Sequence, residues 1–330
     1  MTLHRMHRLA HALALLLVLA ACGTAPAADA PAQPRAAKKA YADLTVGFSQ
    51  IGSESDWRTA NTISIQETAL ELGAKLVFSD AQQKQENQIK ALRSFIAQKV
   101  DVIGISPVVE EGWEPVFKEV KEAGIPLIVL DRRAAVTEDL YTTFIGSDFH
   151  KEGQRACEEM VRLLGGKGGI VELEGTVGSA PALDRKAGFH ECLKGSPDLE
   201  VIAAESGDFT YAKGKEVMEA LLASHSGRIG GLYAHNDDMA LGAIEAIEAA
   251  GLRPGVDIKI VSIDAVSEAF VAMAAGKLNA TVECNPLLGP QFFEAALMIA
   301  NDEPVAKRID SIEGVFRQET AAEELPKRKY

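Results

Sequence analysis

Hydrogen-bonding side chains follow several short apolar runs of this sequence, each at the point where the run ends. They are Glu54, Ser55, Asp56, Trp57 and Arg58 after the run 44–48, Asp131 and Arg132 after 125–130, Asn236 after 229–234, and Asp264 after 258–263. Carboxylates only accept hydrogen bonds, guanidinium groups only donate them, and an amide does both. Together these residue types suit a small polar ligand whose own groups both donate and accept.

The apolar runs that precede these residues are rich in Val and Ile and are separated by segments with helical periodicity. Such runs are typical of buried parallel strands. Ligands of open α/β sheets bind beyond the carboxyl ends of the strands. We therefore expect side chains from distant parts of the sequence to meet at one rim and to form a binding site there.

The alternation of strand and helix patterns occurs twice, first over residues 44–145 and again from residue 150 onward. The predicted fold class is therefore α/β, with two similar doubly wound parallel-sheet lobes joined by a multi-strand hinge. The predicted first lobe contains residues 44–145 and 265–281. The predicted second lobe contains residues 146–264 and 282–330.

The N-terminal segment has the layout of an export signal. Two arginines precede an apolar stretch over residues 12–21 that is too short to span a membrane as a helix. The motif Leu19-Ala20-Ala21-Cys22 resembles a bacterial lipoprotein box, so a signal peptide over 1–21 and lipidation at Cys22 are predicted. A plain signal peptide cleaved a few residues later is the alternative. Residues 22–43, rich in Ala and Pro, are predicted to tether the protein to a membrane in the periplasm or at the cell surface.

The composition argues against several classes of protein. The net charge is −13, and acidic proteins are poorly suited to nucleic acid or to anionic lipid surfaces. The histidines lack metal-ligand spacing, and the cysteines form no CxxC motif. We therefore expect no nucleic-acid partner, no metal and no cofactor.

Two cysteines, Cys157 and Cys192, fall on apolar faces of predicted helices that flank one strand. An exported compartment permits a disulfide between them. Buried reduced thiols are the more common outcome for such residues, so reduced thiols are the expectation and a disulfide is the alternative.

Several motifs resemble, in order along the chain, those of the periplasmic sugar-binding proteins of ABC transporters. They are Val46-Gly47-Phe48-Ser49-Gln50, Asp131-Arg132, Asp184-Arg185-Lys186-Ala187-Gly188-Phe189, His235-Asn236-Asp237-Asp238 and Ser262-Ile263-Asp264. The stretches 52–55, 82–90 and 112–116 are similar to the galactofuranose-binding branch of this ribose/galactose-type family. The resemblance implies a hinged monomeric receptor, without catalytic activity, that captures one monosaccharide between its lobes and delivers it to the permease of an ABC importer.

The resemblance also implies roles for individual residues. The expected hydroxyl-binding residues are Glu54, Ser55, Arg58, Asp131, Arg132, Arg185, Asn236 and Asp264, and the expected aromatic faces on the sugar's C–H groups are Trp57 and Phe209. Two positions depart from the family pattern. Asp56 stands where glycine is expected and adds a carboxylate to the ligand site, and Cys284 stands where ribose receptors have an amide that touches the ligand.

Galactose in its furanose form is the ligand that the resemblance implies. Arg58 follows Trp57 at a position where ribose receptors have a second aromatic residue. Arg58 and Glu54 would hold the two-carbon arm of a furanose hexose by donation and acceptance. Ribose lacks that arm, so it is expected to leave Arg58 unpaired and to bind more weakly.

Three other functions were compared with the sequence, and two of them disagree with it. A transcriptional regulator with the same core would carry a helix-turn-helix where this chain has its predicted signal peptide. A glycosidase would need carboxylates with separate acid and nucleophile roles, whereas each acid here has an arginine or asparagine neighbour. A sugar-sensing subunit for a membrane receptor or kinase is the alternative that stays open, because either partner would recognise the same closed form.

Overall fold

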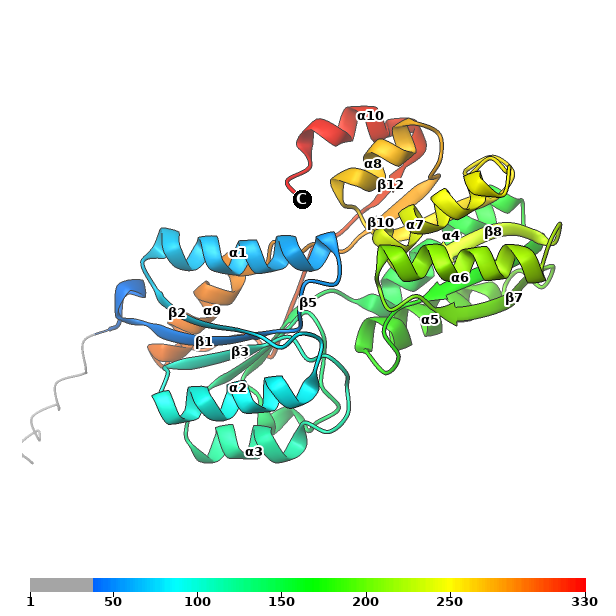
Figure 1. Ribbon diagram of the computed structural model, residues 1–330. Coiled ribbons are helices and arrows are strands. Elements are labelled where there is room, and N and C mark those ends of the chain that lie inside the picture. The colour runs from blue at the N-terminus through cyan, green and yellow to red at the C-terminus, as the bar shows by residue number, and fades with distance from the viewer. Residues whose placement is uncertain (1–37) are drawn as a thin grey trace, which may run out of the picture. The chain divides into compact units, whose positions relative to one another are not determined.

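Two six-stranded sheets organise the protein (Figure 1). The computed structural model describes residues 38–330. Helices cover both faces of each sheet, which confirms the predicted fold class of two α/β lobes. The predicted signal peptide, Cys22 and the tether up to residue 37 lie outside the described residues.

The first lobe contains a fully parallel sheet with the strand order β11-β5-β4-β3-β1-β2. Its strands are β1 (Thr45–Gln50), β2 (Lys75–Asp80), β3 (Val102–Ile105), β4 (Leu127–Leu130), β5 (Thr143–Gly146) and β11 (Arg308–Asp310). One face is covered by α1 (Asp56–Leu72) and α9 (Gly289–Ala300), and the other by α2 (Gln85–Gln98) and α3 (Glu114–Glu122). Because both faces are covered, β3, β4 and β5 are buried along their whole length, as their continuous apolar sequences predict.

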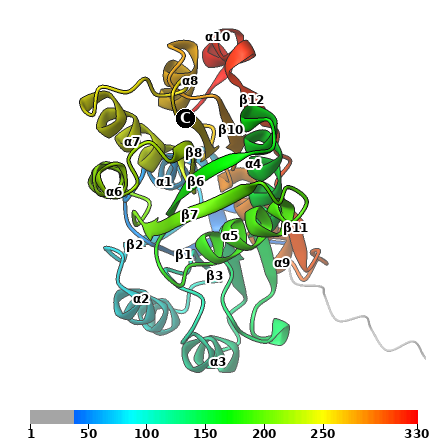
Figure 2. The same cartoon turned by 90° about the vertical axis from the view of Figure 1, so that its right-hand side faces the viewer.

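The second lobe has the strand order β12-β10-β9-β8-β6-β7, in which β12 alone runs antiparallel to its neighbour. Its strands are β6 (Gly168–Glu174), β7 (Leu199–Ser206), β8 (Ile229–Ala234), β9 (Lys259–Asp264), β10 (Ala280–Glu283) and β12 (Val315–Arg317). Its helices are α4 (Phe149–Leu164), α5 (Ala180–Leu193), α6 (Tyr211–Ser224), α7 (Asp237–Ala249), α8 (Ser267–Ala274) and α10 (Ala321–Glu324). Figure 2 shows α4 and α5 on one side of β6 and β7, and α6 and α7 on the other.

Three segments connect the lobes: residues 147–148, 284–288 and 311–314. This arrangement corrects the predicted lobe boundaries after residue 264. Residues 265–281 do not return to the first lobe, because β10 pairs in parallel with β9. Residues 282–330 are not confined to the second lobe, because α9 and β11 belong to the first.

The return of α9 to the first lobe has a packing reason. Phe292 on α9 lies edge-on to Phe48 of β1, with ring centroids 5.3 Å apart. Gly104 in β3 makes room for this ring, since a Cβ atom there would lie 2.5 Å from Phe292 Cε2. The helix thus fills the core beneath the first sheet, which periodicity along the chain does not reveal.

The expectation of reduced thiols at Cys157 and Cys192 is wrong, because a disulfide joins them, with a Cα–Cα distance of 6.1 Å. It links α4 to α5, whose backbones approach closely. A Cβ atom on Gly153 would lie 2.1 Å from the carbonyl oxygen of Arg185, and one on Gly188 would lie 2.0 Å from that of His150. The two glycines bring the helices close enough for the bridge to form.

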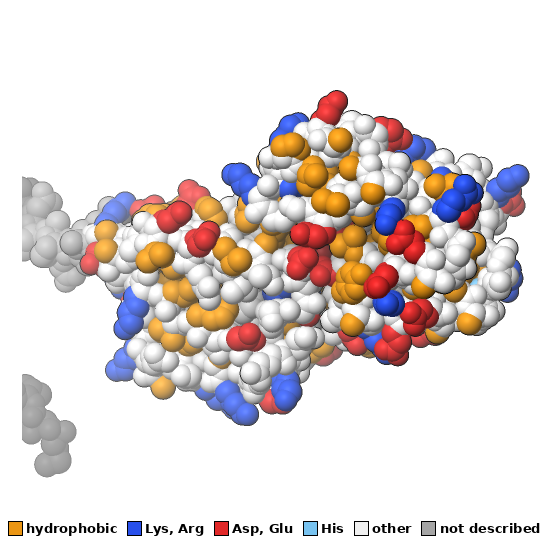
Figure 3. Space-filling view, turned by 45° about the horizontal axis from the view of Figure 1, so that its top comes forward, with side chains coloured by type: hydrophobic (Ala, Val, Ile, Leu, Met, Phe, Trp, Pro, Cys, Tyr) orange, Lys and Arg blue, Asp and Glu red, His pale blue; other side chains and the backbone are white. Residues whose placement is uncertain are grey.

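The last residues of the predicted tether belong to the first lobe. The backbone N–H of Lys39 donates to Oδ1 of Asn301 at 2.7 Å, and residues 41–43 form a short 3-10 turn before β1. In the described part of the chain, no helix is both long and apolar enough to span a membrane. On the face shown in Figure 3, acidic and basic side chains are interspersed, without one continuous basic patch.

Candidate functional site

A small cavity lies between the lobes, and ten of the eleven predicted ligand-binding residues line it. They are Glu54, Ser55, Trp57, Arg58, Asp131, Arg132, Arg185, Phe209, Asn236 and Asp264. The eleventh, Asp56, is exposed and lies outside this lining. Three further lining residues, Phe149, Pro181 and Cys284, were not among the predicted ligand contacts.

The start of α1 positions the first group of cavity residues. Ser55 is the N-cap of the helix, and its side chain accepts a hydrogen bond from the backbone N–H of Arg58. Glu54 and Arg58 are four residues apart, and Nε of Arg58 donates to Oε1 of Glu54 at 3.1 Å. Nη2 of Arg58 donates to Asp131 at 2.6 Å, and Nη1 donates to Gln50 at 3.3 Å. All three guanidinium nitrogens of Arg58 therefore have acceptors within the first lobe.

Arg132 is the second buried guanidinium of the first lobe, and it is less completely paired. Nη1 donates to the carbonyl oxygen of Val108 at 3.1 Å, and Nη2 lies 3.5 Å from Oε1 of Glu54. Nε has no hydrogen-bond partner within the described residues. Burial and the nearby Arg58 lower the pKa of Arg132 to about 10. Arg132 stays protonated at neutral pH and offers an uncommitted donor.

Glu54 provides the matching acceptor. Burial raises its pKa, but Arg58 and Arg132 outweigh that effect, so the net shift is downward and the carboxylate is ionised. Its Oε2 atom is buried and has no partner within the described residues.

The second lobe contributes one guanidinium, that of Arg185 on α5. Nε donates to Oε2 of Glu152 at 2.7 Å, Nη1 donates to the carbonyl oxygen of His235, and Nη2 lies 3.4 Å from Oδ1 of Asp264. The guanidinium carbon also lies 5.2 Å from the ring centroid of Phe149. Burial strongly raises the pKa of Asp264, although Arg185 opposes the shift.

Asn236 has its side chain engaged within the second lobe. It caps α7 by accepting from the backbone N–H of Met239 at 3.1 Å. Its amide donates to the carbonyl oxygen of Phe209 at 3.0 Å. Phe209 has a φ of 62°, a conformation that is uncommon for a bulky residue, and its ring also lies 5.2 Å from the guanidinium carbon of Arg132 in the other lobe.

Trp57 belongs to the first lobe but packs with the core of the second. Its indole N–H donates to the carbonyl oxygen of Cys284 at 2.6 Å, and the guanidinium of Arg58 lies 4.6 Å from its ring centroid. The indole therefore reaches from the first lobe to the second connecting segment, where it lines the cavity.

Direct contacts join the lobes around the cavity. Arg133 forms a two-pronged ion pair with Asp184 on α5. The backbone N–H of Asp56 donates to Oδ1 of Asp238 at 3.1 Å. Burial and the nearby Asp56 and Asp237 raise the pKa of Asp238 to about 7. The lobes are thus in a closed arrangement.

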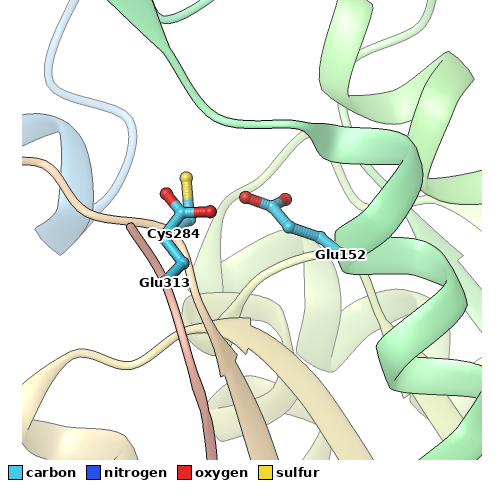
Figure 4. A group of neighbouring side chains, drawn as sticks. All are labelled: Glu152, Cys284 and Glu313. Carbon is cyan, nitrogen blue, oxygen red and sulfur yellow. The ribbon is translucent and has the colours of Figure 1, made fainter. Parts of the chain in front are cut away.

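A second cluster of ionisable groups lies where the connecting segments meet (Figure 4). One ligand-type atom from each of Glu152, Cys284 and Glu313 lies within 4.8 Å of the other two. Burial raises the pKa of Glu313 to about 8 and raises that of the Cys284 thiol well above its usual range. The side chain of Ser147 donates to Glu313, which also accepts from the backbone N–H of Asn285 at 3.1 Å. Because Glu313 and Cys284 are protonated at neutral pH, they add no negative charge next to the Glu152–Arg185 ion pair.

Sequence reasoning missed Phe149, Pro181 and Glu152 for the same reason. None of them follows an apolar run directly, since Phe149 and Glu152 lie in the first turn of α4 and Pro181 lies in the first turn of α5. Asp148 caps the start of α4, where its side chain accepts from the backbone N–H of Lys151. No local pattern of residues indicates that this helix end faces the cavity.

Comparison with known proteins identifies relatives of the whole chain. A family model described as "Periplasmic binding protein domain" matches residues 46–304. The galactofuranose-binding protein YtfQ of Escherichia coli (strain K12) is 46% identical over 319 residues, which cover 95% of this chain and 98% of the relative.

Two solved structures resemble this one closely. The periplasmic component of the arabinose ABC transporter from Shewanella sp. ANA-3, bound to α- and β-L-arabinofuranose, is 49% identical with a TM-score of 0.84, over 86% of this chain and 95% of that one. A Mycobacterium smegmatis protein in complex with β-D-fucofuranose is 51% identical with a TM-score of 0.85, over 87% of this chain and 95% of that one.

Proposed function

The chain belongs to the periplasmic binding protein family, and from that premise we propose that it captures one monosaccharide in furanose form between its lobes. The captured sugar is delivered to the permease of an ABC importer. The protein acts as a monomeric receptor outside the cytoplasm and catalyses no reaction.

One observation carries the binding proposal. Nε of Arg132 and Oε2 of Glu54 are a buried donor and a buried acceptor without partners in the described residues, and both side chains line the cavity. An unsatisfied buried polar group costs about 1–3 kcal/mol. A hydroxyl group can accept from the arginine and donate to the glutamate, and the aromatic rings of Trp57 and Phe209 offer surfaces for the sugar's C–H groups.

The preference for a furanose rests on the relatives and not on Arg58. The sequence argument held that ribose would leave Arg58 unpaired, but Arg58 already has partners in its own lobe. Glu54, Asp131 and Gln50 each accept from one of its three nitrogens without any sugar. The relatives, in contrast, are described with galactofuranose, L-arabinofuranose and β-D-fucofuranose, which share the five-membered ring and differ outside it.

A thermal-shift screen followed by calorimetry tests the proposal, because a ligand that binds only the folded state raises its stability. D-galactose, L-arabinose, D-fucose and D-ribose are the probes, and at least one of the first three is expected to bind more tightly than ribose. Ribose binding as tight as that of all three would contradict the furanose preference. Absence of binding by every sugar would overturn the function.

Closure of the lobes on the sugar is the second part of the proposal. Donors from both lobes line one cavity, so a bound sugar contacts both lobes and favours the closed arrangement. Small-angle X-ray scattering is expected to show a smaller radius of gyration with sugar than without it. An unchanged radius at saturation would argue against a hinge.

Anchoring through Cys22 is proposed from the sequence alone. The Cys22→Ala variant is expected to appear in the soluble fraction or to fail to be processed, because its lipid attachment site is gone. Equal membrane association of the variant and the wild type would remove the anchor from the proposal.

Isolation of membrane partners from native cells distinguishes a permease from a sensor kinase.

A further inference from the structure

Arg185 can interact with two carboxylates, and only one of them lines the cavity. Nε lies 2.7 Å from Oε2 of Glu152, and Nη2 lies 3.4 Å from Oδ1 of Asp264. Asp264 belongs to the cavity lining and Glu152 does not. The shorter contact is therefore made to the acid outside the cavity lining.

The two carboxylates contact different edges of the Arg185 guanidinium. A guanidinium has a side edge at Nε and an outer edge at its two Nη atoms. Glu152 holds the Nε edge from α4, and the carbonyl oxygen of His235 holds Nη1. The rings of Phe149 and Phe209 lie 5.2 and 5.9 Å from the guanidinium carbon. These contacts fix the side chain so that Nη2 and Asp264 are left beside each other at the cavity.

Glu152 is the member of its cluster that pairs with an arginine. Figure 4 shows Glu152 extending from α4 toward Cys284 and Glu313 on the connecting segments. The pKa values of Cys284 and Glu313 are raised by burial, so both are protonated at neutral pH. Burial also raises the pKa of Glu152, and Arg185 opposes that shift. The net pKa shift of Arg185 is upward, because the nearby Glu152 outweighs the effect of burial.

We propose that Glu152 is a positioning residue for sugar binding: it holds Arg185 by its Nε edge and so keeps the contact between Nη2 and Asp264 at 3.4 Å, long enough for a sugar hydroxyl to compete with it. This inference rests on the proposed function. Without Glu152, Arg185 can move onto Asp264, and a closer pairing would engage both the Nη2 donor and the Asp264 acceptor at the cavity. The close approach of α4 and α5 at Gly153 and Gly188 is what brings Glu152 within reach.

The test compares Glu152→Gln with a control on the same helix. Glu159 is also buried and forms ion pairs, with Arg162 at 2.8 Å and Arg317 at 2.6 Å, but it is not part of the cavity. Calorimetry with D-galactose, L-arabinose and D-fucose is expected to show binding to E152Q weakened about tenfold or more. Binding to E159Q is expected to change less than about twofold, although both variants remove a buried carboxylate from its ion pairs.

A double-mutant cycle separates positioning from a general structural effect. Arg185→Lys removes the Nε donor, so adding Glu152→Gln to R185K is expected to cause little further loss of affinity. Additive losses, or E152Q binding within twofold of the wild type, would overturn the inference. If E152Q does not fold, E152D shortens the reach of the carboxylate while keeping its charge and takes its place under the same criteria. A wild type that binds none of these sugars overturns the proposed function itself, which is a distinct outcome.

Discussion

The two lobes place an arginine and an aspartate at corresponding points of the same topology, yet they hold the arginine by different means. Arg58 follows β1 and Asp131 follows β4, while Arg185 follows β6 and Asp264 is the last residue of β9. These strands occupy equivalent positions in the two strand orders. The arginine–aspartate distance is 2.6 Å in the first lobe and 3.4 Å in the second.

Both aspartates also have a positive φ, 62° at Asp131 and 128° at Asp264. Non-glycine residues rarely adopt such conformations, and they persist where the surrounding structure imposes them. The repetition at equivalent strand ends indicates that each lobe uses the same backbone feature to direct a carboxylate toward the cavity.

The second carboxylate on each arginine shows the difference between the lobes. Glu54 is four residues before Arg58 and meets it at the start of a single helix. Glu152 is 33 residues before Arg185 and lies on a neighbouring helix. The first lobe therefore assembles its half of the site locally, whereas the second depends on the packing of α4 against α5.

The largest expected effect comes from removing the aspartate of each lobe. Asp131→Ala leaves the buried Arg58 and Arg132 with Glu54 as their nearby carboxylate, so it is expected to abolish sugar binding and to lower the free energy of unfolding by about 3–5 kcal/mol. Asp264→Ala is expected to lower it less, because Arg185 keeps Glu152. Denaturant unfolding and calorimetry measure both effects. Equal stability losses in the two variants would show that the lobes do not differ in this way.

The disulfide between α4 and α5 tests the dependence of the second lobe on helix packing. Its cysteines are 35 residues apart, so the Cys157→Ser, Cys192→Ser double variant is expected to lose about 3–4 kcal/mol of unfolding free energy. Titration of the denatured Cys22→Ala protein without reductant should find one free thiol, that of Cys284. Three free thiols in that experiment would contradict the bridge.

Glu313, in the third connecting segment, is expected to make the stability depend on pH. Its pKa of about 8 lies above the ordinary value of 4.5, so the folded state binds the proton more tightly than the unfolded state does. Stability is therefore lost as the pH rises from about 4.5 to about 8. Glu313→Gln should remove this dependence and gain on the order of 1–3 kcal/mol at pH 8 relative to pH 5. A stability difference between variant and wild type that does not change with pH would contradict the assignment.

The smallest expected effect concerns the contact between the lobes at Asp238. Its pKa is about 7 when buried in the closed form, and opening exposes it and returns the pKa toward about 4. Protonation therefore favours closure, and sugar affinity is expected to rise on the order of tenfold from pH 8 to pH 5. Asp238→Asn should reduce this dependence, while Asp56→Asn should alter it less. Calorimetry at several pH values measures the sugar affinity. Identical pH profiles for D238N and wild type would refute the role of Asp238.

The sequence by itself determined the features that depend on residues near one another in the chain. Apolar runs located the strands, and the polar residues after them were the ones that line the cavity, because the carboxyl ends of parallel strands meet at one edge. The Ser55 cap and the Glu54–Arg58 ion pair are likewise formed by residues near one another in the chain. Asp56, the one predicted ligand contact outside the cavity, directly follows that cap and is exposed.

Only the tertiary structure decided which distant segments meet. Periodicity reports that a short strand is buried but not which sheet it joins, so the segment after Asp264 was assigned to the wrong lobe. The pairing of Cys157 with Cys192 and of Glu152 with Arg185 depends on two glycines that let α4 and α5 touch. These contacts arise from the packing of complete helices, a property that no local pattern of residues contains.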